Sequence, residues 1–393
     1  EIDEIDPNAA VIYPIVLQDS LEVVVTLPGN RLEHKTISKP RVEVEEIFRN
    51  LRQAIAPSVV NSNRATPDET QTNPATPEDS NPAISEGTQS VRDGGATIRI
   101  KPKAGTGYLA LAKQGYDWLI QPFEDAIKAS GVKTLVFVLD GPMLNLPLAV
   151  LHDGEKFLVE KYAIAQTPGL QLLDSKPLEK GQLTALKAGL SAPRKLTLSP
   201  SKEVVEFSPL PNVERELKEI REEVSGEVLF NEEFTTDAIQ QAIDSVSFPV
   251  VHLATHGQFS SKAEETFILT WDGVLQVNQL GKLLRGREEG GRKAIELLVL
   301  SACETAAGDE RAALGLAGVA VRAGARSTLA TLWVVDDQST ADLMIRFYEE
   351  LKDPQISKAE ALRRAQVWLM QKDNNQYEQP YYWAPFVLVG NWL

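Results

Sequence analysis

Several apolar runs, each closed by a polar or turn-forming segment, predict buried strands along the chain. Uninterrupted runs of this length are typical of strands that are covered on both faces, as in a sheet packed between helices. The clearest of these runs are residues 134–139, 249–254, 296–301, 327–334 and 384–390.

Helical spacing of apolar residues alternates with these runs. Val44, Ile47, Phe48, Leu51 and Ile55 lie three or four residues apart and predict an amphipathic helix over residues 42–54. The same pattern predicts helices over residues 108–120, 213–224, 236–244, 314–323, 340–351 and 358–371. Residues 11–27, followed by the turn sequence Pro28-Gly29-Asn30, predict a strand pair. Strands that alternate with helices predict an α/β fold with an open, mainly parallel sheet flanked by helices.

The composition changes abruptly at residues 57–107, which are rich in Pro, Ser, Thr, Asn, Asp and Gly. Such a segment buries too little apolar surface to offset its ordering entropy, so we expect a flexible surface insertion centred on residues 58–95. Its role is either that of a passive linker or that of a regulatory gate. The expected organisation is therefore an N-terminal strand pair and helix (1–56), the insertion (57–107) and an α/β core (108–393).

The charge and the cysteine count narrow the function. The formal net charge is -15, which repels a phosphate backbone, so nucleic-acid binding is not expected. The charge serves solubility or favours a basic polypeptide partner. No apolar run approaches the ~18–20 residues of a membrane span. A lone cysteine, Cys303, excludes an internal disulfide and multi-cysteine zinc sites and favours a reducing cytoplasm. The chain begins at Glu1 without a secretory signal or an initiator Met, so we expect a fragment whose natural start lies upstream.

Four predicted strands end on residues with reactive or charged side chains. These residues are Asp140, His256, Cys303 and the pair Asp336-Asp337. If the strands are parallel, their carboxyl ends meet at one edge of the sheet, which is where ligands bind in open α/β folds.

Cys303 and His256 together have the chemistry of a nucleophile and its base. An imidazole raises the thiolate fraction of a neighbouring thiol. The backbone N–H groups of Gly257 and Cys303 are candidate donors for an oxyanion. The alternative is that Cys303 is a small buried hydrophobe and His256 a structural residue. His252 lies four residues before His256 on the same strand, where packing is the expected role and a metal pair is the alternative.

The motifs around these residues resemble the CHAT family, which belongs with caspases, metacaspases and separase. They are His-Leu-Ala-Thr-His256-Gly257, Leu-Val-Leu-Ser-Ala-Cys303-Glu-Thr and Leu-Trp333-Val-Val-Asp-Asp337, flanked by Asp140-Gly-Pro-Met-Leu-Asn-Leu-Pro147 and Trp383-Ala-Pro-Phe386-Val-Leu-Val-Gly390. The resemblance runs from about Val11 to Leu393. It implies a caspase-like fold and a cysteine endopeptidase that cleaves a protein partner by a His256–Cys303 dyad, without a metal or other cofactor. CHAT domains often follow tetratricopeptide repeats, so upstream repeats or a regulatory partner are expected.

The resemblance also bears on specificity. Caspase signatures place a Gln-Ala-Cys-(Arg/Gln/Gly)-Gly motif about 50 residues after the histidine, whereas here Ser-Ala-Cys303-Glu-Thr follows His256 by 47 residues. Where caspases use arginines to hold aspartate, this chain has Asp140, Asp336 and Asp337, with Glu304 beside the nucleophile. These carboxylates imply cleavage after a basic residue, Arg before Lys.

Other interpretations of these residues and of the chain remain open. Asp140 can simply begin a turn, and Asp336-Asp337 can cap a helix. For the chain as a whole, a catalytically silent caspase-like scaffold for protein interaction is the main rival. A non-peptidase hydrolase or acyltransferase that uses the same thiol is the third reading.

Overall fold

The computed structural model describes residues 2–56, 107–139, 141–169, 177–178, 183–198, 203–259, 266–276, 278–282, 294–301, 304–305 and 324–393. The expected insertion at 58–95 and the predicted helix over 314–323 lie outside the described residues.

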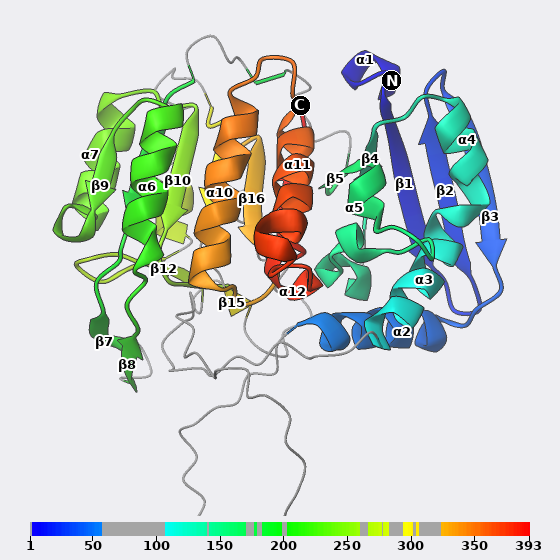
Figure 1. Ribbon diagram of the computed structural model, residues 1–393, viewed down its shortest axis with the longest axis horizontal. Coiled ribbons are helices and arrows are strands. Elements are labelled where there is room, and N and C mark those ends of the chain that lie inside the picture. Colours follow the sequence, from blue (N-terminus) through cyan, green and yellow to red (C-terminus); the bar gives the residue numbers. More distant parts are fainter. Residues whose placement is uncertain are drawn as a thin grey trace, which may run out of the picture.

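One large mixed, mostly parallel sheet of eleven strands forms the centre of the molecule (Figure 1). Its order is β3-β2-β1-β4-β5-β17-β16-β14-β10-β6-β9. The expected open, mainly parallel α/β sheet is thereby confirmed. Its strands are β1 (Ala9–Val16), β2 (Leu21–Leu27), β3 (Arg31–Ile37), β4 (Thr134–Phe137), β5 (Ala163–Gln166), β6 (Ala185–Gly189), β9 (Val228–Phe230), β10 (Val250–Ala254), β14 (Leu297–Leu300), β16 (Ser327–Thr331) and β17 (Phe386–Gly390).

The sheet consists of two parallel blocks joined near its middle. Strands β1, β4 and β5 are parallel, as are β16, β14, β10, β6 and β9. The last strand, β17, runs antiparallel to β16 and meets β5 where Val389 pairs with Gln166. The N-terminal segment therefore extends the same sheet as the rest of the chain.

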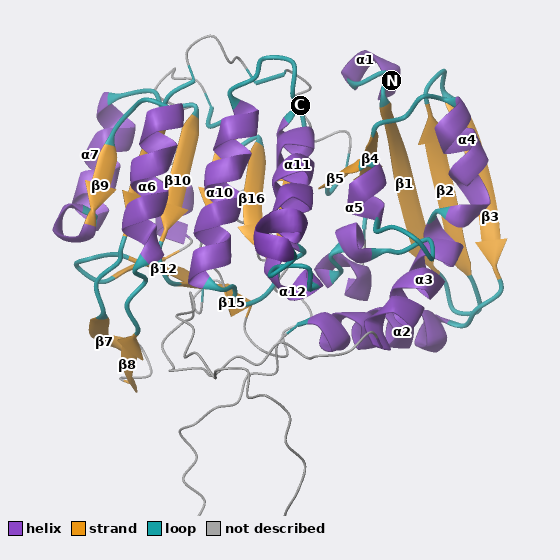
Figure 2. Ribbon diagram, viewed as in Figure 1, coloured by secondary structure: helices purple, strands orange, loops and turns teal. Residues whose placement is uncertain are grey.

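Helices cover the sheet because their apolar stripes match its buried faces. In α2, Val44, Phe48, Leu51 and Ile55 are buried, as the spacing predicts. Figures 1 and 2 show α6 and α10 in front of the block that contains β10 and β16, with α11 beside them, where it packs against β5 and β17. The helices are α1 (Ile2–Ile5), α2 (Arg41–Ile55), α3 (Gly107–Leu119), α4 (Glu124–Ala129), α5 (Leu158–Lys161), α6 (Asn212–Glu223), α7 (Thr236–Ser245), α10 (Asp337–Leu351), α11 (Lys358–Gln371) and α12 (Pro380–Trp383).

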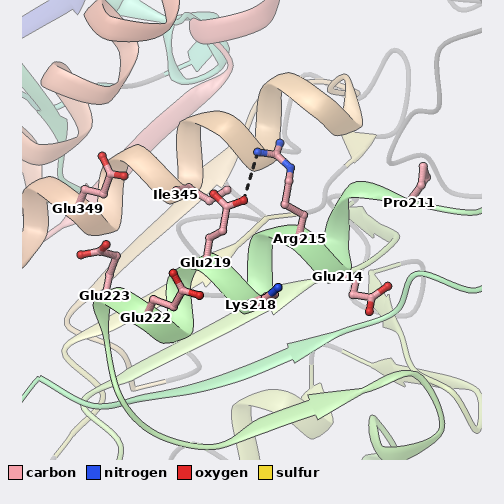
Figure 3. A pocket seen from close by; sticks show the side chains of 9 residues that line it. All are labelled: Pro211, Glu214, Arg215, Lys218, Glu219, Glu222, Glu223, Ile345 and Glu349. Carbon is pink, nitrogen blue, oxygen red and sulfur yellow. Dashed lines mark ion pairs between the residues drawn. The ribbon is translucent and has the colours of Figure 1, made fainter.

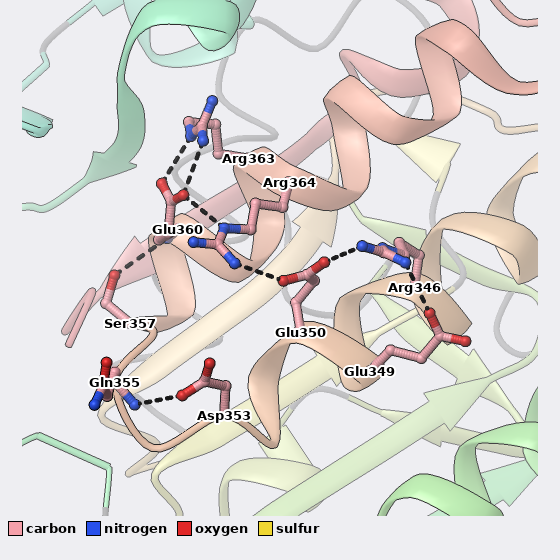
Figure 4. A network of polar contacts seen from close by, with 9 residues as sticks. All are labelled: Arg346, Glu349, Glu350, Asp353, Gln355, Ser357, Glu360, Arg363 and Arg364. Carbon is pink, nitrogen blue, oxygen red and sulfur yellow. Dashed lines mark hydrogen bonds and ion pairs between the residues drawn. The ribbon is translucent and has the colours of Figure 1, made fainter.

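Ion pairs on the outer surface join α10 to α11 (Figure 4). Glu350 of α10 accepts from Arg364 of α11 at 3.0 Å and also from Arg346 on its own helix. Glu360 accepts from both Arg363 and Arg364. A shared network fixes long side chains better than isolated surface pairs do, so the two helices keep their relative position over the sheet.

The structure also contains strands that the apolar pattern did not predict. The turn at Pro28–Asn30 leads into the edge strand β3, whose Arg31, Glu33, His34 and Lys35 protect an unpaired sheet edge. A small sheet adds β13 (Val274–Gln276), β11 (Gly257–Phe259) and β15 (Glu304–Thr305) to β12 (Phe267–Leu269), the one of its strands that the sequence pattern at 266–271 does predict. A separate hairpin consists of β7 (Arg194–Leu198) and β8 (Glu203–Phe207).

Within the described part of the chain, none of the helices is both long enough and apolar enough to cross a bilayer.

Candidate active site

The carboxyl ends of β10, β14 and β16 lie at one edge of the sheet because the three strands are parallel, as the sequence predicts. Figure 1 shows the arrowheads of β10 and β16 at the lower edge. Strands β1, β4 and β5 belong to the other block, where β5 is parallel to β17 and β17 is antiparallel to β16. By these pairings β4 runs opposite to β16, so the predicted meeting of strand ends at one edge holds for β10, β14 and β16. Asp140, three residues after β4 ends at Phe137, lies outside the described residues. The edge is therefore the place where a site can form from several strands.

His256 lies at this edge between β10 and β11, and it is almost completely buried. Its Nε2 lies 2.7 Å from the main-chain carbonyl oxygen of Ser208. A carbonyl oxygen can only accept, so Nε2 carries the proton that is donated. In the neutral ring this leaves Nδ1 as the basic nitrogen. The Ser208 carbonyl thus fixes both the tautomer and the orientation of the imidazole.

The hairpin β7–β8 places Ser208 beside the histidine. Phe207, the last residue of β8, is buried, and its ring centroid lies 5.5 Å from that of His256. At the base of the hairpin, Arg194 lies over the Trp271 ring at 4.2 Å and donates to the Trp271 carbonyl at 2.6 Å. A cation over an aromatic face together with a hydrogen bond anchors the hairpin to the turn between β12 and β13.

The segment after His256 pairs with the segment after Cys303. Gln258 of β11 is opposite Glu304 of β15 in a parallel register. On the other side of the cysteine, the Ser301 N–H donates to the Leu253 carbonyl at 2.9 Å. Cys303 itself lies outside the described residues, as does Ala302. The residues on either side of them, Ser301 and Glu304, both pair with the segment 253–258 that contains His256.

The Gly257 N–H points toward the β15 side of β11. Leu269 of β12 donates to the His256 carbonyl at 2.8 Å, and Gly257 is opposite Ile268. In an antiparallel ladder this makes Gly257 and Ile268 the non-hydrogen-bonded pair, so the Gly257 N–H turns away from β12. It faces β15, which begins one residue after Cys303.

The two aspartates after β16 have hydrogen-bond partners within the fold. Asp336 is the N-cap of α10, and its carboxylate accepts from the Ser339 N–H at 2.8 Å. Asp337 accepts from both the backbone and the side-chain amide of Asn212, at 2.8 and 2.9 Å. Both side chains are buried. Burial, and after it the charge of Asp336, raises the pKa of Tyr381.

Three partners of the site are not among the residues predicted from the sequence. One is the Ser208 carbonyl, which has no side-chain signal. The others are Glu216 of α6 and Tyr348 of α10, which hydrogen-bond to the buried His252 at 3.0 and 3.2 Å. Glu216 had a detectable signal, since it falls within the apolar stripe of α6. Within the described ranges, no cluster of three or more His, Cys, Asp or Glu is arranged to hold a metal ion.

The family model described as CHAT domain matches residues 109–391. None of the curated proteins matches the chain. Among solved structures, the crystal structure of the Arg-specific cysteine proteinase gingipain R is similar, with 9% identity and a TM-score of 0.45 over 73% of this chain and 68% of that chain. A complex of the pro- and mature domains of RgpB from Porphyromonas gingivalis shows 11% identity and a TM-score of 0.41 over 73% and 69% of the two chains. Both likenesses are distant.

Proposed function

The chain belongs to the CHAT domain family, and from this premise we propose that it is a cysteine endopeptidase in which Cys303 attacks the substrate carbonyl and His256 transfers the proton. The observation that carries the proposal is the pairing of Gln258 with Glu304. It joins the chain just after the imidazole to the chain just after the thiol. The fixed Nε2–H of His256 leaves its other nitrogen for the thiol proton.

The proposed reaction needs only groups of the protein. Nδ1 of His256 takes the Cys303 proton, and the thiolate forms a bond to the carbonyl carbon. The negative charge moves to the carbonyl oxygen, where the N–H groups of Gly257 and Cys303 donate to it. The imidazolium returns the proton to the leaving amine as the C–N bond breaks. Water then attacks the thioester with His256 as base, which releases the acid and restores the thiol.

The Ser208 carbonyl supports the charged intermediate. Its oxygen, 2.7 Å from Nε2, accepts from the imidazolium as well as from the neutral ring. A hydrogen bond to a charged donor is roughly twice as strong as one between neutral groups. The contact therefore favours the protonated state that forms during each transfer.

Cleavage after a basic residue, Arg before Lys, is part of the proposal. Asp140 and Glu304 are the carboxylates best suited to hold such a residue, since Asp336 and Asp337 already bind Ser339 and Asn212. A planar guanidinium matches a carboxylate in bidentate geometry, which favours Arg. The substrate is a protein or peptide, recognised with the help of upstream repeats or a regulatory partner.

The proposal is tested with fluorogenic peptides that carry Arg, Lys or Asp before the reporter. We expect release from the Arg peptide first, and none from Cys303→Ala or His256→Ala. Cleavage that persists in Cys303→Ala removes the peptidase proposal, and hydrolysis of the Asp peptide alone overturns the basic specificity. A folded wild-type protein that binds its partner without turnover identifies the scaffold instead.

A further inference from the structure

A buried carboxylate lies beneath the ends of the two strands that lead to His256 and Cys303. Glu216 on α6 has no exposed surface, and the same is true of His252, Ser301 and Tyr348 around it. The other carboxylates of α6, including Glu214, line an outer hollow (Figure 3), whose volume is about 570 Å³. A buried ionised carboxylate costs several kcal/mol in desolvation unless it is well hydrogen-bonded. Burial of Glu216 therefore depends on the hydrogen bonds that its carboxyl group receives.

Two donors from two different strands converge on one oxygen of Glu216. Ser301 Oγ donates to Oε1 at 2.7 Å, and His252 Nε2 lies 3.0 Å from the same atom. The other ring nitrogen of His252 is 3.2 Å from the hydroxyl of Tyr348 on α10. Glu216 Oε1 accepts from Ser301, so the His252 Nε2 facing the same oxygen is the donor, and Nδ1 of the neutral ring is left to accept from the Tyr348 hydroxyl. Burial, with a smaller contribution from Glu216, holds the pKa of Tyr348 well above its ordinary value.

These contacts are made by residues close in sequence to each member of the proposed dyad. His252 lies four residues before His256 on β10, and Ser301 lies two residues before Cys303. The segment that leads into α6 carries the Ser208 carbonyl, which holds the imidazole. The segment before α6 therefore holds His256 through the Ser208 carbonyl oxygen, and α6 itself holds the end of the cysteine strand through the Glu216 carboxylate.

We infer that Glu216 is a positioning residue that fixes the cysteine strand against the histidine strand through Ser301 and His252. The expected effect on catalysis rests on the proposed function, whereas the contacts of Glu216 do not depend on it. Strand pairing alone sets the backbone register of β10 and β14. Glu216 adds a fixed distance from each strand end to α6 and so sets how the thiol meets the imidazole.

Removal of this carboxylate should affect the chemical step rather than substrate binding. Because a misplacement of about 1 Å at a reacting group can cost about 100-fold in rate, we expect kcat to fall at least about tenfold in Glu216→Ala. We expect the KM to stay within about twofold, the pattern of an interaction made in the transition state. Glu216→Gln retains an oxygen that accepts from Ser301 and should fall between wild type and Glu216→Ala. Ser301→Ala is the milder variant if Glu216→Ala does not fold.

Alkylation of the chain's one cysteine gives a second readout that needs no peptidase substrate. The rate of reaction with iodoacetamide as a function of pH reports the thiolate fraction of Cys303. We expect the alkylation profile to move to higher pH in Glu216→Ala and Ser301→Ala, since the thiol is then less well aligned with the imidazole. A double-mutant cycle between the two should be non-additive, because both substitutions remove the same hydrogen bond between Ser301 and Glu216.

Gln366→Ala is the matched control for loss of a buried polar group. Gln366 on α11 is buried and donates to the carbonyls of Trp383 in α12 and Phe386 in β17, so these contacts involve neither β10 nor β14. Folded Glu216→Ala and Ser301→Ala proteins that lose thermal stability as the control does, but keep the wild-type kcat and alkylation profile, overturn the positioning role. If wild type cleaves no peptide, the peptidase proposal fails, while the alkylation profiles still decide the role of Glu216.

Discussion

Lys187 of β6 links the stability of the protein to pH. It contacts the C-terminal end of α6, the helix that carries Glu216. This β6 residue is completely buried, and its Nζ donates to the carbonyls of Ala185, Val224 and Ser225 at 3.2, 2.9 and 3.3 Å. Val224 is the C-cap of α6, where a cation also meets the negative end of the helix dipole. Burial, and after it the charge of Arg221, lowers the pKa of Lys187 to about 8.

The sign of the pH effect follows from this lowered pKa. Between pH 8 and 10.5 the folded lysine is neutral while the unfolded lysine is still charged, so unfolding takes up a proton and stability rises with pH. The interval between about 8 and the ordinary value of 10.5 corresponds to about 3 kcal/mol, at about 1.4 kcal/mol per pH unit. We expect this gain to be absent below pH 8 and complete above 10.5.

Urea unfolding followed by tryptophan fluorescence, from pH 7 to 11, measures the effect. Lys187→Met removes the titrating group, so the difference between wild type and variant should change by about 3 kcal/mol across the window. Tyrosines that titrate late contribute to both curves and cancel in the difference. Lys195→Met, which removes an exposed lysine of β7, should retain the wild-type rise. Parallel curves for wild type and Lys187→Met refute the reasoning.

Two further substitutions test packing and capping near the site. In Gly189→Ala the new Cβ would lie 2.7 Å from both Leu217 and Val213 of α6, so we expect a loss of about 1–3 kcal/mol in the free energy of unfolding; an unchanged melting temperature would mean that α6 moves away freely. Asp336→Ala removes the cap on Ser339 and should cost about 1 kcal/mol while the preference for Arg peptides stays the same. Loss of that preference would return Asp336 to the substrate pocket.

The buried elements could be predicted from the sequence because their patterns are local. Continuous apolar runs correspond to β4, β10, β14, β16 and β17, and helical stripes to α2 and α6 within a residue or two. The edge strand β3 and the hairpin β7–β8 were missed, since their faces are largely exposed and carry charged side chains such as Lys35 and Lys195. The order of the strands was also beyond the pattern. Strand β17, the last in sequence, lies between β5 and β16 because of contacts that join distant segments.

The site was predicted where it depends on strand ends and missed where it depends on the fold. The place of His256 and Gly257 after β10 follows from an apolar run that stops. Glu216 could have been suspected, because a carboxylate in the stripe of Val213, Leu217 and Ile220 faces the interior. The Ser208 contact could not, since the acceptor is a peptide oxygen that every residue type has.

Because the acceptor at His256 is a peptide oxygen, the contact does not depend on which amino acid occupies position 208. Replacement of the Ser208 side chain leaves the oxygen at the imidazole in place, because the atom belongs to the peptide unit. A saturation scan should therefore find position 208 tolerant, although its backbone orients the proposed base. The orientation of the histidine is thus protected against point substitution at that position, and it is vulnerable instead to insertions or deletions that shift the chain between β8 and α6.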